Sequence, residues 1–231
     1  MLIRASALLL AVLVLCSGCV LRPGIHGSGV SHSEFRPIPN GFEEVDLSGF
    51  GTVNILVGEP YSVCVTTDDN LVEHIETSVD NGKLKIKTRG RLKPKTGLTV
   101  DVTVPQLSAA HISGAGDMNV IDVSSESLDL SISGAGTLMA TGCVDEISTS
   151  ISGAGDAELE NLIARHAHVK VAGAGDVSIF ATESVTARVA GAGDVVCYGN
   201  PLHVDQRIAG AGDFIMKDSQ EQQQYSLGDE F

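Results

Sequence analysis

The chain has 231 residues, of which 43% are hydrophobic and 26 are glycine, and it contains no tryptophan. Fifteen Lys and Arg residues stand against 29 Asp and Glu residues, which gives a formal net charge of −14 at pH 7. This composition excludes a wholly disordered chain, and the negative charge argues against a nucleic-acid partner because the phosphates would be repelled.

The first 18 residues are predicted to be a lipoprotein signal peptide. An apolar run over residues 5–15 follows Arg4, and the small residues Ser17 and Gly18 precede Cys19, as expected of a lipoprotein cleavage site. The run is shorter than the roughly 20 residues of a membrane-spanning helix. We therefore expect Cys19 to be the lipidated first residue of an exported protein anchored in the bacterial outer membrane. An ordinary cleaved signal peptide is the alternative.

Residues 19–40 contain several Gly, Pro and Ser residues without periodicity, which predicts a flexible tether. Alternating apolar residues then fill residues 41–107, with a turn predicted at Asp80-Asn81-Gly82. This segment is expected to form irregular coils that cap the region after it. The polar tail, residues 219–231, is expected to cover the opposite end.

Residues 108–218 contain six copies of Gly-Ala-Gly-Asp, one of them changed to Gly-Ala-Gly-Thr, at intervals of 20, 19, 20, 18 and 19 residues. Apolar residues alternate with polar ones around each copy, as in Val185, Ala187 and Val189, and a period of two predicts strands with one buried face. A regular period of this length predicts stacked units. Together they predict an all-β fold, a parallel β-helix with coils of about 19 residues, in one domain over residues 41–218.

Each copy is predicted to form a corner of the coil, where glycine permits positive φ and close backbone approach. The predicted corner glycines are Gly114, Gly116, Gly134, Gly136, Gly153, Gly155, Gly173, Gly175, Gly191, Gly193, Gly210 and Gly212.

The repeated Ser-Gly-Ala-Gly-Asp or Ala-Gly-Ala-Gly-Asp, the preceding Val-Thr-Val-Pro-Gln-Leu at residues 102–107 and an upstream Asp-Asn-Gly-Lys-Leu-Lys-Ile resemble the bacterial DUF2807 family, also called the auto-transporter adhesin head or GIN domain. The resemblance covers roughly residues 40–218. It implies a right-handed parallel β-helix-like fold on an envelope protein, often a lipoprotein. It implies little about activity.

The aspartates that close the copies are expected to form a ladder, because equivalent positions of a parallel β-helix lie about 4.8 Å apart. One interpretation is that each aspartate accepts backbone amides of its own glycine corner. The alternative is that adjacent carboxylates bind calcium weakly, which would be the one cofactor of the protein. The ladder consists of Asp156, Asp176, Asp194 and Asp213, with Asp117 separated from it by Thr137.

Basic residues occupy every second position of a short run in the first half of the chain. One interpretation is a solvated face that protects a sheet edge. The other is a contact with an anionic surface, such as lipid headgroups or acidic glycan near the lipid anchor. The run comprises Lys83, Lys85, Lys87, Arg89, Arg91, Lys93 and Lys95.

No catalytic constellation or confident metal site stands out in the sequence. His166 and His168 share a strand face but lack a third ligand nearby, and Cys64, Cys143 and Cys197 allow at most one disulfide after processing. The preferred function is a non-catalytic envelope lipoprotein that binds, adheres or acts as a scaffold, with envelope glycan or another envelope protein as partner. The alternative is a β-helix lyase or hydrolase acting on acidic glycans, an analogy of fold alone.

Overall fold

The structure, a computed structural model, describes residues 24–217, which are all-β. In this range one 3₁₀ turn, Val72–His74, is the only helical element, and no helix could cross a membrane. The predicted signal peptide, Cys19 and the tail at 219–231 lie outside the described residues. The strands are β1 Ile25–His26, β2 Ser31–Phe35, β3 Glu44–Val57, β4 Ser62–Asp68, β5 Ile75–Asp80, β6 Lys83–Thr88, β7 Leu92–Lys93, β8 Thr99–Val104, β9 Ala109–Gly134, β10 Thr137–Gly153, β11 Asp156–Gly173, β12 Val177–Gly191, β13 Val195–Gly199, β14 His203–Gly210 and β15 Phe214–Lys217.

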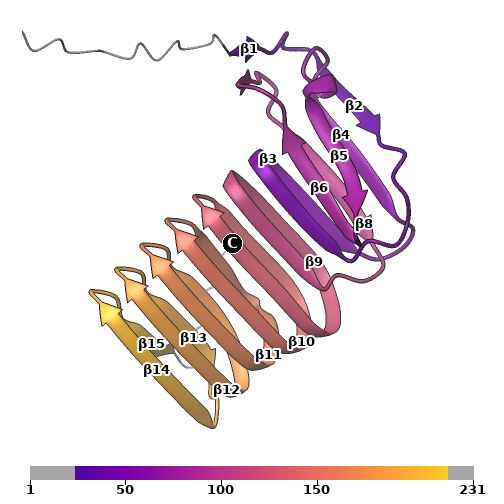
Figure 1. Cartoon of the computed structure of the whole chain (residues 1–231). Helices are drawn as coiled ribbons and strands as arrows, with labels where there is room; N and C mark the ends of the chain where they lie inside the picture. The colour runs from indigo at the N-terminus through magenta and orange to yellow at the C-terminus, as the bar shows by residue number, and fades with distance from the viewer. Residues whose placement is uncertain (1–23, 218–231) are drawn as a thin grey trace, which may run out of the picture.

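The Gly-Ala-Gly-Asp repeats stack on one another through parallel pairs. β10 pairs in parallel with β9 and β11, and β11 pairs with β12. The next repeat is divided between two shorter strands, because β12 pairs with β13 through 177–181 and with β14 through 184–191. Figure 1 shows this stack running from the magenta and orange strands to β14 and β15 in yellow.

The stack has two layers with the core between them. Layer A contains the segment before each Gly-Ala-Gly-Asp copy, such as 184–191 of β12, and layer B contains the segment after it, such as 177–181. Val185 and Val189 in layer A and Val177 in layer B are 1–2% exposed, and the polar residues between them face outward. The alternation in the sequence therefore places one apolar row of each layer in the core.

The N-terminal end of the stack is closed by antiparallel strands. β3 pairs in parallel with β9 on one side, and on the other with β6 and β8. Beyond these, β5 lies antiparallel to β6, β4 lies antiparallel to β8, and β2 lies antiparallel to β4. The 13-stranded sheet is therefore mixed. The predicted all-β class is confirmed, but the cap is built from antiparallel strands and not from the expected coils.

The reason lies in the turns of this region. The alternating pattern is the same for parallel and antiparallel strands, so the direction depends on the connections. Asn81 and Gly82 have φ angles of 52° and 75°, which suits a tight hairpin, and β5 and β6 consequently pair antiparallel. The turn predicted at Asp80-Asn81-Gly82 is confirmed.

The described part of the expected tether is packed against this cap. β1 pairs with β7 and β2 pairs with β4. The buried Asp68 joins the two regions, because its carboxylate accepts the N–H of Gly29 at 2.6 Å and that of Lys95 at 2.8 Å. The segments of residues 24–40 that form β1 and β2 are therefore part of the fold, whereas the sequence predicted a flexible tether.

At the glycine corners the backbone of one repeat lies directly against that of the preceding repeat. Gly173 has a φ of +151°, and a Cβ there would lie 2.0 Å from the carbonyl oxygen of Gly153, which accepts the N–H of Ala174 at 2.8 Å. Gly175 needs no positive φ, but its Cβ would lie 1.9 Å from the oxygen of Gly155. Stacking leaves no room for a side chain at either position.

We predict that Gly175→Ala lowers the free energy of unfolding by about 1–3 kcal/mol, because the new methyl group overpacks the corner. Gly173→Ala should cost about 2–5 kcal/mol, since strain of the positive φ adds to the overlap. Urea denaturation measures both. Gly58→Ala is the control, because Gly58 has open space around its Cβ position and no positive φ. Equal stabilities for all three variants would contradict the assignment of the corners.

A second prediction concerns acid stability. Burial raises the pKa of the Asp68 carboxyl, but the backbone N–H groups of Thr96, Gly29 and Lys95 outweigh this effect and hold the pKa below its usual value. The ionised form therefore stabilises the fold above the unfolded-state pKa of about 3.9, and this contribution is lost as the pH falls through the lower folded-state pKa.

Asp68→Asn should consequently reduce stability at pH 7 and flatten its decline below pH 4. Thermal melts between pH 7 and pH 2 measure both effects. The exposed Asp101→Asn is the matched control. An unchanged acid limb in Asp68→Asn would show that this carboxylate does not tie the segments together.

Candidate functional site

The predicted aspartate ladder lies at the start of layer B, and all its carboxylates except that of Asp213 are hydrogen-bonded to the next repeat. The Oδ1 atoms of Asp156, Asp176 and Asp194 accept the N–H groups of Asp176, Asp194 and Asp213 at 2.8–2.9 Å. Thr137 interrupts this pattern. Its N–H donates to the carboxylate of Asp117, but threonine has no carboxylate that could accept the N–H of Asp156. The aspartates thus accept hydrogen bonds from the next repeat, whereas one interpretation of the sequence expected them to accept amides of their own corner.

These bonds account for the row of carboxylates without a metal. Two unit charges about 4.8 Å apart repel by about 0.9 kcal/mol in water, and a hydrogen bond to a charged acceptor is worth about 1.5–3 kcal/mol. Within residues 24–217 no group of three or more His, Cys, Asp or Glu residues is arranged to hold a metal ion. Weak calcium binding at the ladder stays a prediction.

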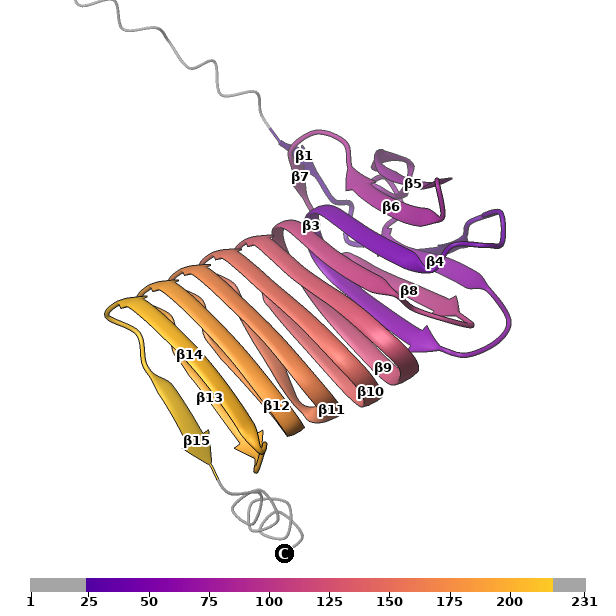
Figure 2. The same cartoon turned by 60° about the horizontal axis from the view of Figure 1, so that its bottom comes forward.

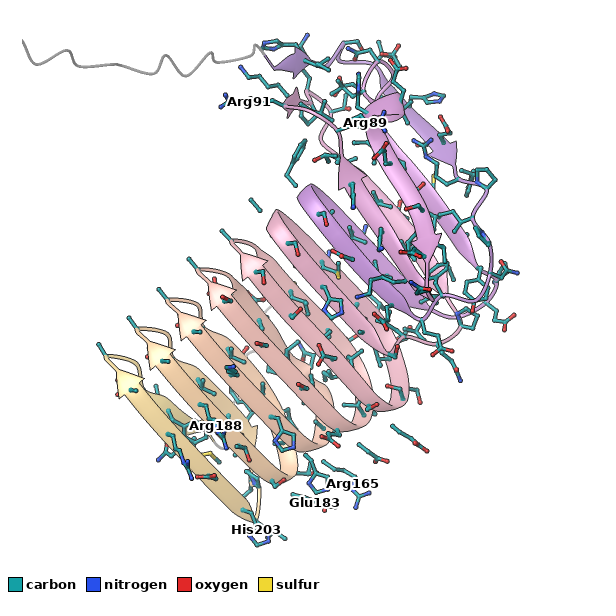
Figure 3. All side chains as sticks on the ribbon, viewed as in Figure 1. Arg89, Arg91, Arg165, Glu183, Arg188 and His203 are labelled. Atoms are coloured by element: carbon teal, nitrogen blue, oxygen red, sulfur yellow. The ribbon has the colours of Figure 1, made fainter. Side chains whose placement is uncertain are left out.

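The basic run lies at the N-terminal end of the stack, where Figure 3 shows Arg89 and Arg91 far from the labelled Arg188. Lys83 pairs with Glu44 at 2.9 Å, Lys85 pairs with Asp80 at 2.6 Å, and Arg89 pairs with Glu76. β6, which carries the first three lysines, has a neighbouring strand on each side. It is therefore not an edge that those lysines could protect.

The rest of the run lies beside the point where the described chain begins. Arg91 precedes the short strand β7 and Lys93 is its last residue. β7 pairs with β1, and the N–H of Ile25 donates to the carbonyl of Arg91. Neither side chain has an acidic partner within 4.0 Å among the described residues. The structure thus divides the run into an ion-paired part and a part beside β1, the first described strand.

A second group of cations, not singled out from the sequence, lies on the outer face of layer A. Lys170 of β11 lies beside Arg188 of β12 in the parallel strand register, and Arg188 lies beside Arg207 of β14 in the same way. All three side chains are exposed and have no ion-pair partner among the described residues. We call this group the cation column. Its members lie about 4.8 Å apart along the stack.

An open hollow of about 440 Å³ lies against the cation column. Lys170, Arg188 and His168 line it together with a row of hydroxyl groups, and its lining contains no carboxylate. Cations surrounded by hydroxyl donors form a site for sulfate, phosphate or carboxylate groups. The outward hydroxyl side chains are those of Ser148, Ser150 and Thr186. Thr149 also borders the hollow, but its hydroxyl group is buried on the core side of β10.

The column is conspicuous because the surrounding half of the chain is acidic. Residues 97–231 contain 19 acidic and 5 basic side chains. Of the two basic residues outside the column, Arg165 pairs with Glu183 at 2.8 Å and Lys217 lies over the Tyr198 ring. The sequence carries a signal that finds the column, since each member stands three residues before the first glycine of its copy.

The remaining predicted positions do not converge on a reactive site. His166 bonds Ser184 at 2.8 Å, and His168 lies 3.5 Å from Glu146. The three described cysteines, Cys64, Cys143 and Cys197, are free thiols. Burial raises the pKa of Cys197 to about 11, which leaves its thiol protonated and unreactive at neutral pH.

Comparisons with known proteins agree with this architecture. The family model DUF2807, described as "Putative auto-transporter adhesin, head GIN domain", matches residues 41–201. A comparison with curated protein sequences found no match.

Several solved bacterial structures are similar to this chain. A "putative adhesin" from Bacteroides fragilis is 20% identical with a TM-score of 0.70, and one from Parabacteroides distasonis is 22% identical with a TM-score of 0.53. A "putative lipid binding protein" from P. distasonis is 19% identical with a TM-score of 0.53. Each match covers 84% of this chain and 100% of the other. At these identities the similarity establishes the fold alone.

Proposed function

Because this chain belongs to the DUF2807 family, we propose that it is a non-catalytic binding or adhesion protein of the bacterial envelope. Its ligand is an anionic polymer, a glycan that carries negative groups at regular intervals. The observation that carries this proposal is the cation column of Lys170, Arg188 and Arg207, stacked in register on an exposed face.

The backbone positions of the three cations lie about 4.8 Å apart, so an anion beside them would reduce the repulsion between their like charges. The hydroxyl row and the open shape of the hollow suit an extended chain lying across the strands. A deep pocket is not required for this type of contact, because affinity comes from repeated weak contacts.

The finer architecture that we propose is a right-handed parallel β-helix standing on a lipid anchor at Cys19. The described chain enters the fold next to Arg91 and Lys93, so an anchor before it would bring these cations close to anionic headgroups. The cation column lies on the repeats nearer the other end of the stack. An outer-membrane location would then hold the column away from the membrane.

We predict that replacing all three column residues by Gln weakens binding to immobilised dextran sulfate by about tenfold or more. Each exposed cation contributes roughly 0.5–1 kcal/mol, and a tenfold change is about 1.4 kcal/mol. Surface plasmon resonance at 50 and 300 mM salt measures the affinity. The salt dependence should also weaken, because fewer charges are neutralised.

The control is the triple variant Lys87→Gln, Arg91→Gln and Lys93→Gln, which removes the same charge from the N-terminal end. It should retain wild-type affinity for dextran sulfate, and neutral dextran should bind neither protein. An equal loss of affinity in both triple variants would contradict a specific role for the cation column, because any three positive charges would then contribute alike. Incubation with polygalacturonate tests the enzyme alternative, and cleavage by the wild-type protein would overturn the non-catalytic assignment.

A separate prediction concerns the anchor. Cys19→Ala should block lipid attachment, so the protein should shift from the detergent phase to the aqueous phase in Triton X-114 partition, or accumulate unprocessed. Cys16→Ala is the matched control and should partition like the wild type. Normal processing and retention of Cys19→Ala in the detergent phase would show that Cys19 is not the lipidated residue.

A further inference from the structure

The two ends of the stack differ in how their strand edges are covered. The N-terminal end is closed by the antiparallel strands β5, β4 and β2. At the other end β14 pairs with β12, β15 pairs with β13, and neither has a further neighbour among residues 24–217. Figure 2 shows the two yellow strands at this end. The outer N–H and C=O groups of β14 therefore form a free edge of eight residues.

The core is open at the same place. Val204 and Ile208 occupy the inward positions that Val185 and Val189 fill in the preceding repeat. The preceding pair is 1% and 2% exposed, whereas Val204 is 45% and Ile208 is 39% exposed. A free strand edge with exposed core side chains is a template for pairing with another strand.

The sequence of β14 is complementary to itself. In an antiparallel pair of two β14 strands centred on Gln206, Val204 faces Ile208 of the second strand on the core side. Asp205 faces Arg207 on the outer side, and both contacts occur twice. Opposite charges and apolar side chains directly across an antiparallel pair are stabilising.

No other register gives both kinds of contact. Centring the pair on Asp205 or on Arg207 places two like charges directly opposite each other, which is destabilising. Centring it between two residues would place core-facing side chains opposite outward-facing ones, contrary to the pleat. The charges of β14 therefore specify one self-pairing, in contrast to lysines of a single sign, which would repel a second copy.

We propose that the C-terminal end of the stack binds a second copy of this chain, with the two β14 strands paired antiparallel about a two-fold axis at Gln206. Such an interface is isologous and closes at two copies. It takes Arg207 out of the cation column, because this side chain faces Asp205 of the second copy, and it leaves Lys170 and Arg188 on the outward face of each copy.

Disulfide trapping in the full chain tests this arrangement. In a Cys143→Ser background, Gln206→Cys places two thiols opposite each other on the axis, within the range of a disulfide. Mild oxidation should convert most of the protein to a species of twice the mass on a non-reducing gel. Asp205→Cys alone should stay monomeric, but should cross-link to Arg207→Cys when the two variants are mixed.

Charge exchange provides a measurement that does not depend on oxidation. Asp205→Arg should raise the dissociation constant of the dimer by about tenfold, because two attractive pairs become repulsive. The double variant Asp205→Arg with Arg207→Asp should restore dimerisation. Sedimentation of the full chain in detergent measures both constants.

Two outcomes would overturn the proposal. The first is equal cross-linking of Gln206→Cys and Asp205→Cys, or none. The second is a monomeric full chain that dimerises only after residues 218–231 are deleted, which would identify this segment as the occupant of the edge.

Discussion

Close backbone stacking at the glycine corners is the constraint on which the rest of this structure depends. The carbonyl of Gly153 accepts the N–H of Ala174, and the same oxygen occupies the place of a Cβ on Gly173. This contact recurs from repeat to repeat, and it fixes which residue of one repeat lies beside which residue of the next. The repeated glycines therefore determine the register between neighbouring repeats. They do not act by filling the core.

Register also determines the electrostatics, because it gathers residues that are 18–20 positions apart into rows. In the aspartate row the carboxylates of Asp156, Asp176 and Asp194 each accept an amide of the next repeat, so hydrogen bonds between repeats offset the repulsion of the like charges. In the cation column the side chains end in solvent without an acidic partner among the described residues. The first row is offset by hydrogen bonds between repeats, whereas the second is the row that we propose to bind an anionic ligand.

The repeat period and the alternation predicted the all-β class and the inward rows, since both are local properties of the chain. They could not predict the antiparallel cap, because alternation is the same in both strand directions and the pairing of β4 with β8 depends on connections. The aspartate acceptor was assigned to its own corner because the inter-repeat hydrogen bond exists only after stacking. Lys170 and Arg188 could have been found together by aligning the copies on their first glycine.

The two ends of the stack show how a repeated strand structure is terminated. An interior repeat buries its inward side chains because a neighbour covers each edge, and a terminal repeat needs a substitute for the missing neighbour. At the N-terminal end the substitute is encoded by hairpins such as that at Asn81 and Gly82. At the other end Val204 and Ile208 keep two of the apolar inward positions but are partly exposed, and the polar Gln206 stands where Ala187 is buried in the preceding repeat. Asp205 and Arg207 occupy the outward positions between them. A terminal strand that keeps inward apolar residues at a free edge favours a further strand as its cover.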